Sequence, residues 1–121
     1  MIVQGTNLKV IDNTGARKAI CIKVLGNGRK VARIGDVIVV SIKKCSKKSK
    51  VKPGSIYKSL VVRTKYPIKT KNSTYISFLD NSIILLNDKL DMLGTRINGL
   101  LSRNINIQCR RKIISSSRYS I

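Results

Sequence analysis

Lysine side chains are the residues whose number and spacing point most directly to a chemistry in this sequence. The stretch KKCSKKSKVKPGS places six lysines between positions 43 and 52. A cluster of ammonium groups loses too much hydration to be buried, so it must meet water or phosphate. Lysine is a point charge without a planar donor fork, and such contacts hold a nucleic-acid backbone without reading its bases. The cluster therefore predicts a loop docked on phosphates; the competing interpretation is a mobile, solvated run that aids solubility.

The charge of the whole chain favours the phosphate interpretation. It carries 25 lysines and arginines against five acidic residues, a formal net charge of +20 over 121 residues. A domain this small would repel itself strongly in isolation, so we expect a polyanionic partner. Nucleic acid fits better than a membrane, because no apolar run approaches the roughly 18 residues needed to span a bilayer.

Catalytic and metal-binding chemistry is poorly supported. The acids are scattered aspartates, and the chain has no glutamate or histidine, so no acid-base pair, cofactor site or small-molecule substrate is expected. The cysteines, Cys21, Cys45 and Cys109, are odd in number and lack C-x-x-C spacing. We predict reduced thiols without metal, with Cys21 in the core.

The segments around the lysine cluster must position it. GDVIVVSI and IYKSLVVRTK flank the cluster and are almost wholly apolar or β-branched toward their centres, which predicts strands apolar on both faces. Further short strands are expected at 8–11, 18–25 and 82–87, and about six such strands favour a small closed barrel. The predicted interior, or else its alternating neighbours, consists of Ile20, Ile22, Val24, Ile38, Val40, Leu60, Val62, Ile84 and Leu86.

Two further segments complete the predicted organisation of one domain over residues 1–121. Residues 63–78 predict a β-ribbon with a lysine-rich tip, and it should project from the body because Pro67 cannot donate to a ladder. Residues 98–121 are rich in asparagine and isoleucine, so any helix there should be short and weak. Gly26-Asn27-Gly28 lacks the third glycine of a dinucleotide fingerprint and predicts a turn.

Several motifs occur together in the order of a known family. TNLKVIDNTGARKAICIKVLG is followed by IGDVIVVSIKK, VKPGSIYKSLVVRT and GTRINGLL. Over residues 1–103 the chain resembles the universal large-ribosomal-subunit protein fourteen family. The resemblance implies a mainly β fold, a five-stranded β-barrel with a protruding β-ribbon and a small helical C-terminal element.

The resemblance also implies a function and partners. Members of the family are structural, non-enzymatic constituents of the large ribosomal subunit that bind its rRNA. They abut ribosomal proteins three and nineteen and face small-subunit rRNA across the intersubunit face. The rival interpretation is a free-standing OB-like module that grips single strands, which would need aromatic stacking platforms on a sheet face.

The composition and N-terminus indicate a compartment. The chain is rich in isoleucine, asparagine and lysine and has only three alanines, as expected of an A+T-rich coding genome. MIVQGTNLKV shows neither a signal-peptide apolar block nor an arginine- and serine-rich transit segment. We expect a protein encoded and used inside mitochondria, in the mitochondrial ribosome of the matrix, with a plastid or a bacterial cytoplasm as alternatives.

RNA-binding residues are predicted among the basic side chains of turns, loops and strand ends. The positions that match the family's motifs are Arg17, Lys18, Lys23, Arg63 and Arg96. The remaining candidates, from the charge pattern, are Arg29, Lys30, Arg33, Lys43, Lys44, Lys47, Lys48, Lys50, Lys52, Lys65, Lys69, Lys71, Arg103, Arg110, Arg111 and Lys112.

Overall fold

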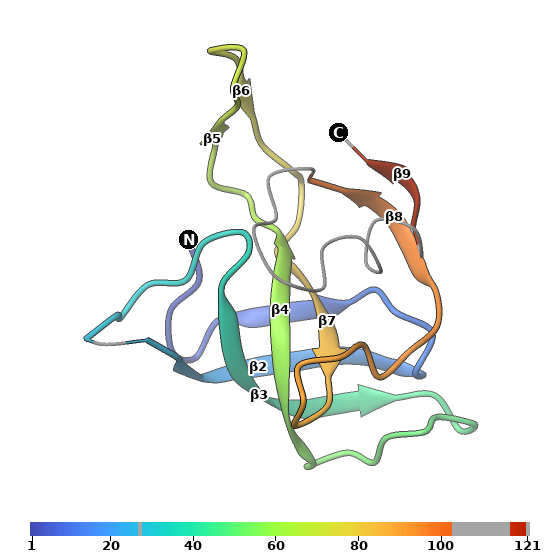
Figure 1. The fold of residues 1–121 in the computed structure, drawn as a ribbon. Helices are drawn as coiled ribbons and strands as arrows, with labels where there is room; N and C mark the ends of the chain where they lie inside the picture. Colours follow the sequence, from blue (N-terminus) through green and yellow to red (C-terminus); the bar gives the residue numbers. More distant parts are fainter. Residues whose placement is uncertain (27, 103–116, 121) are drawn as a thin grey trace.

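The structure is a computed structural model that describes residues 1–26 and 28–102 and the backbone of residues 117–120 (Figure 1). Within these residues the regular structure is entirely β, and no helix long and apolar enough to cross a membrane occurs. The strands are β1 (Asn7–Val10), β2 (Ala16–Val24), β3 (Val37–Cys45), β4 (Ile56–Arg63), β5 (Ile68–Lys69), β6 (Tyr75–Ile76), β7 (Ser82–Leu86), β8 (Ile97–Leu101) and β9 (Ser117–Ser120).

Five strands close a barrel in the order β1-β2-β3-β4-β7, which confirms the predicted fold. Every neighbouring pair is antiparallel except the closing pair, β1 with β7. There Lys9 lies opposite Ser82 and Val10 opposite Ile83. The N–H of Ile11 also donates to the carbonyl of Ile83 at 3.2 Å. Closure matters because it leaves no unpaired strand edge on the barrel.

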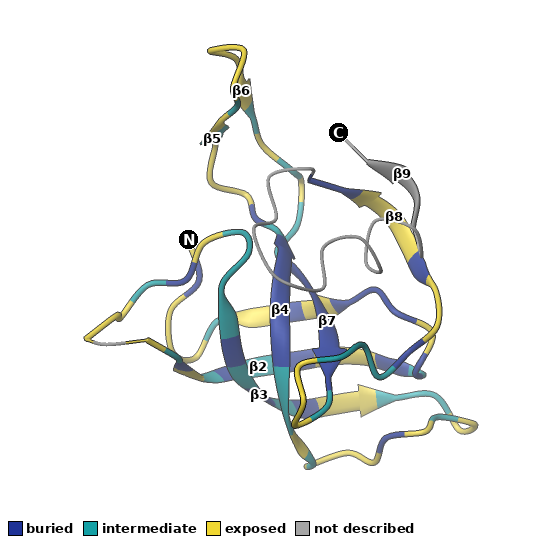
Figure 2. Cartoon of the chain, viewed as in Figure 1, coloured by how far each residue is buried: buried dark blue, intermediate teal, exposed yellow. Residues whose placement is uncertain are grey.

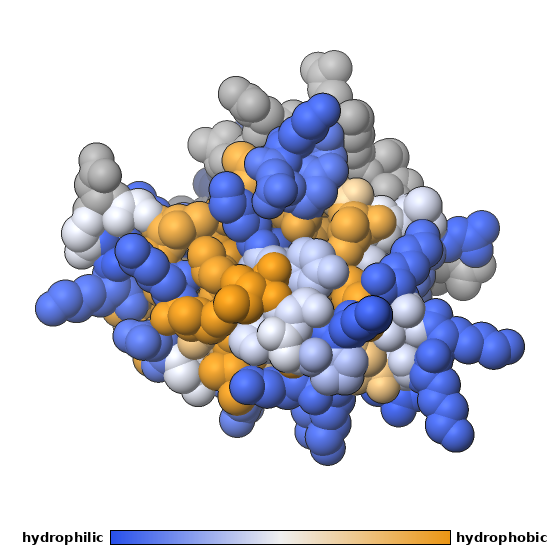
Figure 3. All heavy atoms as spheres, turned by 90° about the horizontal axis from the view of Figure 1, so that it is seen from below, coloured by the Kyte–Doolittle hydropathy of each residue, from blue (hydrophilic) through white to orange (hydrophobic). Residues whose placement is uncertain are grey.

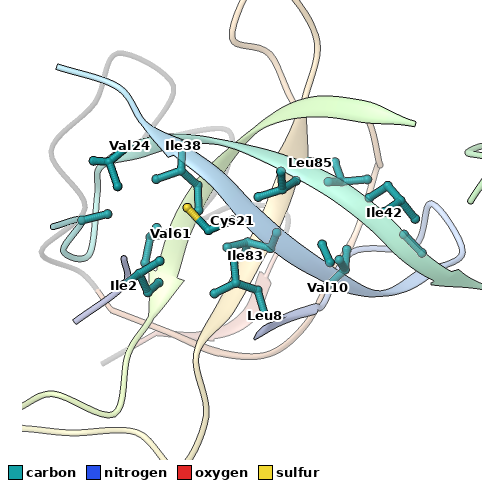
Figure 4. Packing of buried hydrophobic residues seen from close by; sticks show 14 of the residues in the cluster. Ile2, Leu8, Val10, Cys21, Val24, Ile38, Ile42, Val61, Ile83 and Leu85 are labelled. Carbon is teal, nitrogen blue, oxygen red and sulfur yellow. The ribbon is translucent and has the colours of Figure 1, made fainter. Parts of the chain in front are cut away.

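The barrel interior is filled by one hydrophobic cluster (Figure 4). All five barrel strands contribute to it, through Leu8, Val10, Ala19, Cys21, Val24, Ile38, Val40, Ile42, Val61, Ile83 and Leu85. The prediction is therefore right for Ile38 and Val40 on β3 and for Val24 on β2.

The facing of β2 differs from the prediction over part of its length. Ala19 and Cys21 fill the interior. Ile20 and Ile22, predicted inside, are only half-buried. A register shift lies between Cys21 and Lys23, and beyond it the strand points inward again at Val24. Since a one-residue shift inverts the two faces of a strand, alternation alone could not place this bulge.

Strand β7 and residues 59–62 of β4 are buried on both faces, as Figure 2 shows. Their inward residues are the alternating neighbours of the predicted ones. The residues first predicted inside lie instead in a second hydrophobic cluster, formed with residues of β8 and of the segment between β1 and β2: Ile11, Leu60, Val62, Ile84, Leu86, Ile97 and Leu101. Strand β8 thus folds back and covers the outer face of these two strands.

The predicted ribbon is present as the two-stranded sheet of β5 and β6, which projects from the barrel (Figure 1). At its tip the N–H of Ser73 donates to the carbonyl of Thr70 at 3.2 Å, and the N–H of Thr70 donates to the carbonyl of Thr74 at 2.7 Å. Ser73 has a φ of 61°. This is a three-residue hairpin loop with its last residue in the left-handed region, a position that glycine usually occupies.

The C-terminal element is a correction. Residues 98–101 and 117–120, predicted to be weakly helical, lie in strands β8 and β9, which pair in parallel. The N–H of Asn98 donates to the carbonyl of Ile11 at 2.8 Å, so β8 is tied to the barrel. These long-range backbone bonds override the weak helix preference of isoleucine and asparagine. The remainder of the predicted element lies outside the described residues.

Because Ile83 lies in the barrel interior and Ile22 does not, truncating these two isoleucines should lower the free energy of unfolding by different amounts. Ile83→Ala removes a fully buried side chain and should lower the free energy of unfolding by about 2–5 kcal/mol. Ile22→Ala removes a half-buried side chain of β2 that belongs to neither hydrophobic cluster and should cost about 1 kcal/mol. Chemical denaturation of the two variants measures the difference. Equal losses would show that the outer face of β2 is packed as tightly as the interior.

Candidate nucleic-acid interface

A buried aspartate fixes the turn between β1 and β2. Asp12 is 6% exposed. Its Oδ1 accepts hydrogen bonds from the N–H and the hydroxyl of Thr14, and its Oδ2 accepts the N–H of Leu85 at 2.9 Å. Hydrogen bonds to a carboxylate are among the stronger ones in proteins. One side chain therefore shapes the turn and attaches it to β7.

The same turn holds the loop between β3 and β4, residues 46–55, which with the end of β3 carries the lysine cluster. The carbonyl of Gly15 accepts the N–H of Ser46, and that of Thr14 accepts the N–H of Lys50, each at 2.8 Å. Gly15 has a φ of +94°, and a Cβ there would lie 2.4 Å from Cβ of Ser49. Only glycine lets the two backbones approach this closely.

The lysine cluster is thus built on a folded loop. Val51, in its middle, is 1% exposed, and the hydroxyl of Ser49 donates to the carbonyl of Val51. The N–H of Gly54 donates to the carbonyl of Ile42 at 2.7 Å. An apolar anchor and backbone hydrogen bonds leave the lysines exposed on a defined surface; they are Lys43, Lys44, Lys47, Lys48, Lys50 and Lys52.

Three lysines form a row across neighbouring strands. Lys9 on β1 is the register partner of Lys18 on β2, and Lys18 is the partner of Lys44 on β3. Directly opposite residues have Cβ atoms about 4.5–5.5 Å apart, and like charges at that spacing destabilise a sheet. We call Lys9, Lys18 and Lys44 the lysine row. Such a row is unfavourable in the free protein and favourable beside a polyanion.

Two register irregularities add cations to this row. The shift between Ala16 and Lys18 leaves Arg17 without a register partner on β3, and the next shift leaves Lys43 without one on β2. Bulges of this kind redirect side chains and are common beside functional sites. Both residues line the same groove as the lysine row.

The cationic groove, as we call it, has a volume of about 700 Å³ and an apolar floor that includes Ile20. Its only carboxylate is Asp80. The Oδ2 of Asp80 lies 3.2 Å from a guanidinium nitrogen of Arg63 and 3.9 Å from Nζ of Lys9. The cations that line the groove are Lys9, Arg17, Lys18, Lys43, Lys44 and Lys65.

Arg63 is used within the protein. Its side chain is 13% exposed, and Nη2 donates to Asp80 and, at 3.0 Å, to the hydroxyl of Ser82. A Cβ at Gly99 would lie 3.0 Å from Nη1, so the guanidinium packs under the backbone of β8. Of the predicted RNA-binding residues whose side chains are described, it is the one that is not exposed.

The other predicted residues fall on several surfaces. Arg17, Lys18, Lys43, Lys44 and Lys65 meet in the cationic groove, and Lys47, Lys48, Lys50 and Lys52 are exposed on the loop that follows β3. Lys23, Arg29, Lys30, Arg33, Lys69, Lys71 and Arg96 are exposed elsewhere on the barrel and ribbon. Arg103, Arg110, Arg111 and Lys112 lie outside the described residues. Lys9 was missed, because a single lysine in a short strand shows no charge pattern until the strands are paired.

Polar contacts hold two of these arginines, one through its backbone and one through its side chain. Oδ1 of Asn13 accepts the N–H groups of Thr95 and Arg96, at 2.8 and 3.2 Å, so the turn after β1 also places Arg96. Arg29 pairs with Asp36 at 2.9 Å. Exposed pairs of this kind contribute little to stability.

Seen from below, long hydrophilic side chains project around the periphery of the molecule and apolar surface lies toward its middle (Figure 3). The lower end of β4 contributes Ile56, which is 65% exposed. Ile56 lines a hollow of about 430 Å³ together with Val39, Leu86 and Leu93. Basic and apolar surface are therefore both available on the barrel.

Nothing in the described residues resembles a catalytic or metal centre. They contain no group of three or more metal-ligating side chains. Cys21 and Cys45 are free thiols, and Cys109 lies outside the described residues. Burial raises the pKa of Cys21, and a hydrogen bond to the backbone of Lys23 lowers it by less. Such a thiol stays protonated and unreactive.

The barrel also lacks the aromatic platform of a module that grips single strands. Its five strands are described in full, and their only aromatic residue is Tyr57, which is half-buried. Stacking along a sheet face needs exposed rings on adjacent strands.

A small closed barrel with a cationic outer groove is typical of a structural protein of a ribonucleoprotein particle. The family model of ribosomal protein L14p/L23e matches residues 1–121. The chain belongs to this family, as its motifs indicated. It is accordingly a structural, non-enzymatic component of the large ribosomal subunit, and its family implies contact with rRNA and with other ribosomal proteins.

The close approach at Gly15 predicts a large effect of one methyl group. Gly15→Ala should destabilise the protein by about 2 kcal/mol or more, because it combines an unfavourable φ with a backbone clash. Gly5→Ala is the matched control: its φ is +88°, but a Cβ there meets nothing within 4 Å. Denaturation midpoints of both variants isolate the clash. Similar losses would mean that the loop yields at Ser49 without cost.

Proposed function

We propose that the chain binds large-subunit rRNA through the cationic groove and the exposed lysines of the adjoining loop. The lysine row carries this proposal: strand pairing makes three lysines register partners on neighbouring strands, and a phosphate backbone would offset the repulsion between their charges. The groove adds three more cations, and its single carboxylate is already engaged by Arg63 and Lys9.

The contacts of this groove should be to phosphates. Five of its six cations are lysines, which offer no planar fork for a base edge. Base pairs of an RNA helix are hard to read from its deep, narrow major groove, so recognition by shape and backbone is expected. Specificity would come from the folded shape of the rRNA against a rigid barrel and loop.

The remaining basic residues extend the interface that we propose. Exposed cations elsewhere on the barrel and on the ribbon should add phosphate contacts; they include Lys23, Arg29, Lys30, Arg33, Lys69, Lys71 and Arg96. For Arg63 we propose a positioning role, since its ion pair with Asp80 fixes the segment before β7 at the groove rim. Arg103, Arg110, Arg111 and Lys112 stay in the proposed set on charge alone.

Protein neighbours are the second part of the proposal. The resemblance to the family supports contacts with large-subunit proteins three and nineteen and a position at the intersubunit face beside small-subunit rRNA. The exposed Ile56 and the aliphatic side of the hollow that it lines favour a protein neighbour there over rRNA, because exposed aliphatic surface gains most from apolar contact.

The compartment is proposed from composition. The isoleucine-, asparagine- and lysine-rich sequence with three alanines supports an A+T-rich organellar gene and hence a mitochondrial ribosome.

Salt dependence tests the groove directly. Lys18→Gln combined with Lys44→Gln should lower the magnitude of the logarithmic salt slope of rRNA binding by about 1.5, because each phosphate contact contributes about 0.7–0.9. The measurement is the affinity for large-subunit rRNA over a series of salt concentrations. Lys58→Gln combined with Lys89→Gln removes the same charge away from the groove and should change the slope less. Equal changes of the salt slope in the two double variants would mean that binding responds to net charge alone and not to the groove.

The ribbon should serve assembly more than folding. Replacing residues 69–74 by a two-residue Asn-Gly turn should weaken incorporation into large subunits while leaving the barrel's unfolding free energy within about 0.5 kcal/mol, since an isolated two-stranded ribbon contributes little stability. Co-sedimentation with large subunits and chemical denaturation give the two readouts. A loss of unfolding free energy as marked as the loss of incorporation would mean that the ribbon is part of the folded core.

A further inference from the structure

A second hollow, of about 330 Å³, lies at the base of the ribbon and shares no lining residue with the cationic groove. Its wall is formed by Tyr66 and Pro67 of the segment that leads into β5, and by Ile68 and Lys69 of β5 itself. Arg33 closes it from the segment before β3, which reaches the ribbon base in Figure 1. The volume is at the lower end of the range of small-molecule sites, so it suits one nucleotide and not a duplex.

Tyr66 supplies the aromatic ring of this hollow, and hydrogen bonds hold the backbone around it. Tyr66 is 50% exposed. Its carbonyl accepts the hydroxyl of Thr64 at 3.2 Å, and Thr64, which is 2% exposed, accepts the N–H of Phe78 through its own carbonyl at 3.1 Å. The ring of Pro67 further restricts the chain at this point. The tyrosine is therefore positioned without being part of the core.

Two cations flank the ring. Both carboxylate oxygens of the neighbouring Asp36 are engaged: Oδ1 accepts from Arg29 at 2.9 Å, and Oδ2 accepts the backbone N–H of Arg33 at 2.8 Å. The guanidinium of Arg33 is exposed and available for another anion. Lys69, also exposed, supplies the second positive charge.

We propose that this hollow binds one unstacked nucleotide of rRNA, with the base against the ring of Tyr66 and the flanking phosphates on Arg33 and Lys69. An aromatic face bordered by cations is the arrangement by which proteins hold single-stranded nucleotides. A docking site for a protein is less favoured, because the two flanking side chains are cations and the whole chain carries a net charge of +20. The site rests on the proposed rRNA-binding function and adds recognition of an unpaired base to it.

The experiment compares two probes, octauridylate and a strand of eight abasic ribonucleotides, which share their phosphates and differ in their bases. Fluorescence anisotropy with the full chain, at an ionic strength that weakens the phosphate contacts, measures both affinities. Tyr66→Ala should weaken octauridylate binding by roughly 5- to 150-fold, the range found for loss of one stacked base. It should leave binding of the abasic strand unchanged, and Tyr66→Phe should retain wild-type affinity for both.

Tyr75→Ala is the matched control, because Tyr75 is an even more exposed tyrosine on the same ribbon, at 69%, and does not line the hollow. It should change neither affinity. Equal losses for both probes with Tyr66→Ala, no loss for either, or the same base-dependent loss with Tyr75→Ala, would overturn the site. So would a Tyr66→Ala variant that binds both strands normally and yet fails to join the large subunit, which would point to a protein neighbour. If the wild-type chain bound neither strand, the proposed rRNA contact would fail as well.

Discussion

The carboxylate of Asp12 is the interaction on which the arrangement of this protein depends. It is buried, and its described partners are the hydroxyl and N–H of Thr14 and the N–H of Leu85. A buried carboxylate is costly unless its lone pairs are satisfied, so the turn is held in the one shape that supplies these donors. From that shape follow the backbone bonds to the lysine loop and, through the adjacent Asn13, the position of the segment before β8. This one turn thus links the closing strand pair of β1 and β7, the loop that carries the lysine cluster, and β8, which covers the outer face of β4 and β7.

Apolar and charged surfaces are separated around the barrel by this arrangement. Strand β7 and the second half of β4 are enclosed from inside by the barrel core and from outside by β8, and so residues 60–62 and 83–86 are all apolar. Strands β1 and β2 and the end of β3 have one face in the core and present lysines on the other. The charge is concentrated on the face that no element of the described chain covers, and the bulges at Arg17 and Lys43 increase it there.

Much of this could be predicted from the sequence. β-branched runs between turn signals predicted the closed barrel, Pro67 predicted a projecting ribbon, and the lysine cluster predicted a basic loop.

Three features could not be predicted, because they depend on contacts between distant segments. A bulge at Cys21 and Lys23 changes the facing of β2, which has no local signal beyond alternation. The second cluster requires knowing that β8 returns over β4, since a strand apolar on both faces does not show which face is inside. Lys9 joins the site only through its register with Lys18. Arg63 shows the converse, because a basic residue at a strand end can serve an internal ion pair.

The lysine row has a consequence for the abundance of the protein. The repulsion between these register partners raises the free energy of the folded protein while it is free, and a polyanion that neutralises the row relieves this repulsion and so stabilises the folded form. Folding and incorporation are then thermodynamically linked: the unincorporated protein opens more often than the incorporated one. Proteases that capture opened chains act in proportion to that population. Copies made in excess of their rRNA would therefore be degraded first, and the repulsion between three lysines would help to match the supply of the protein to the number of ribosomes.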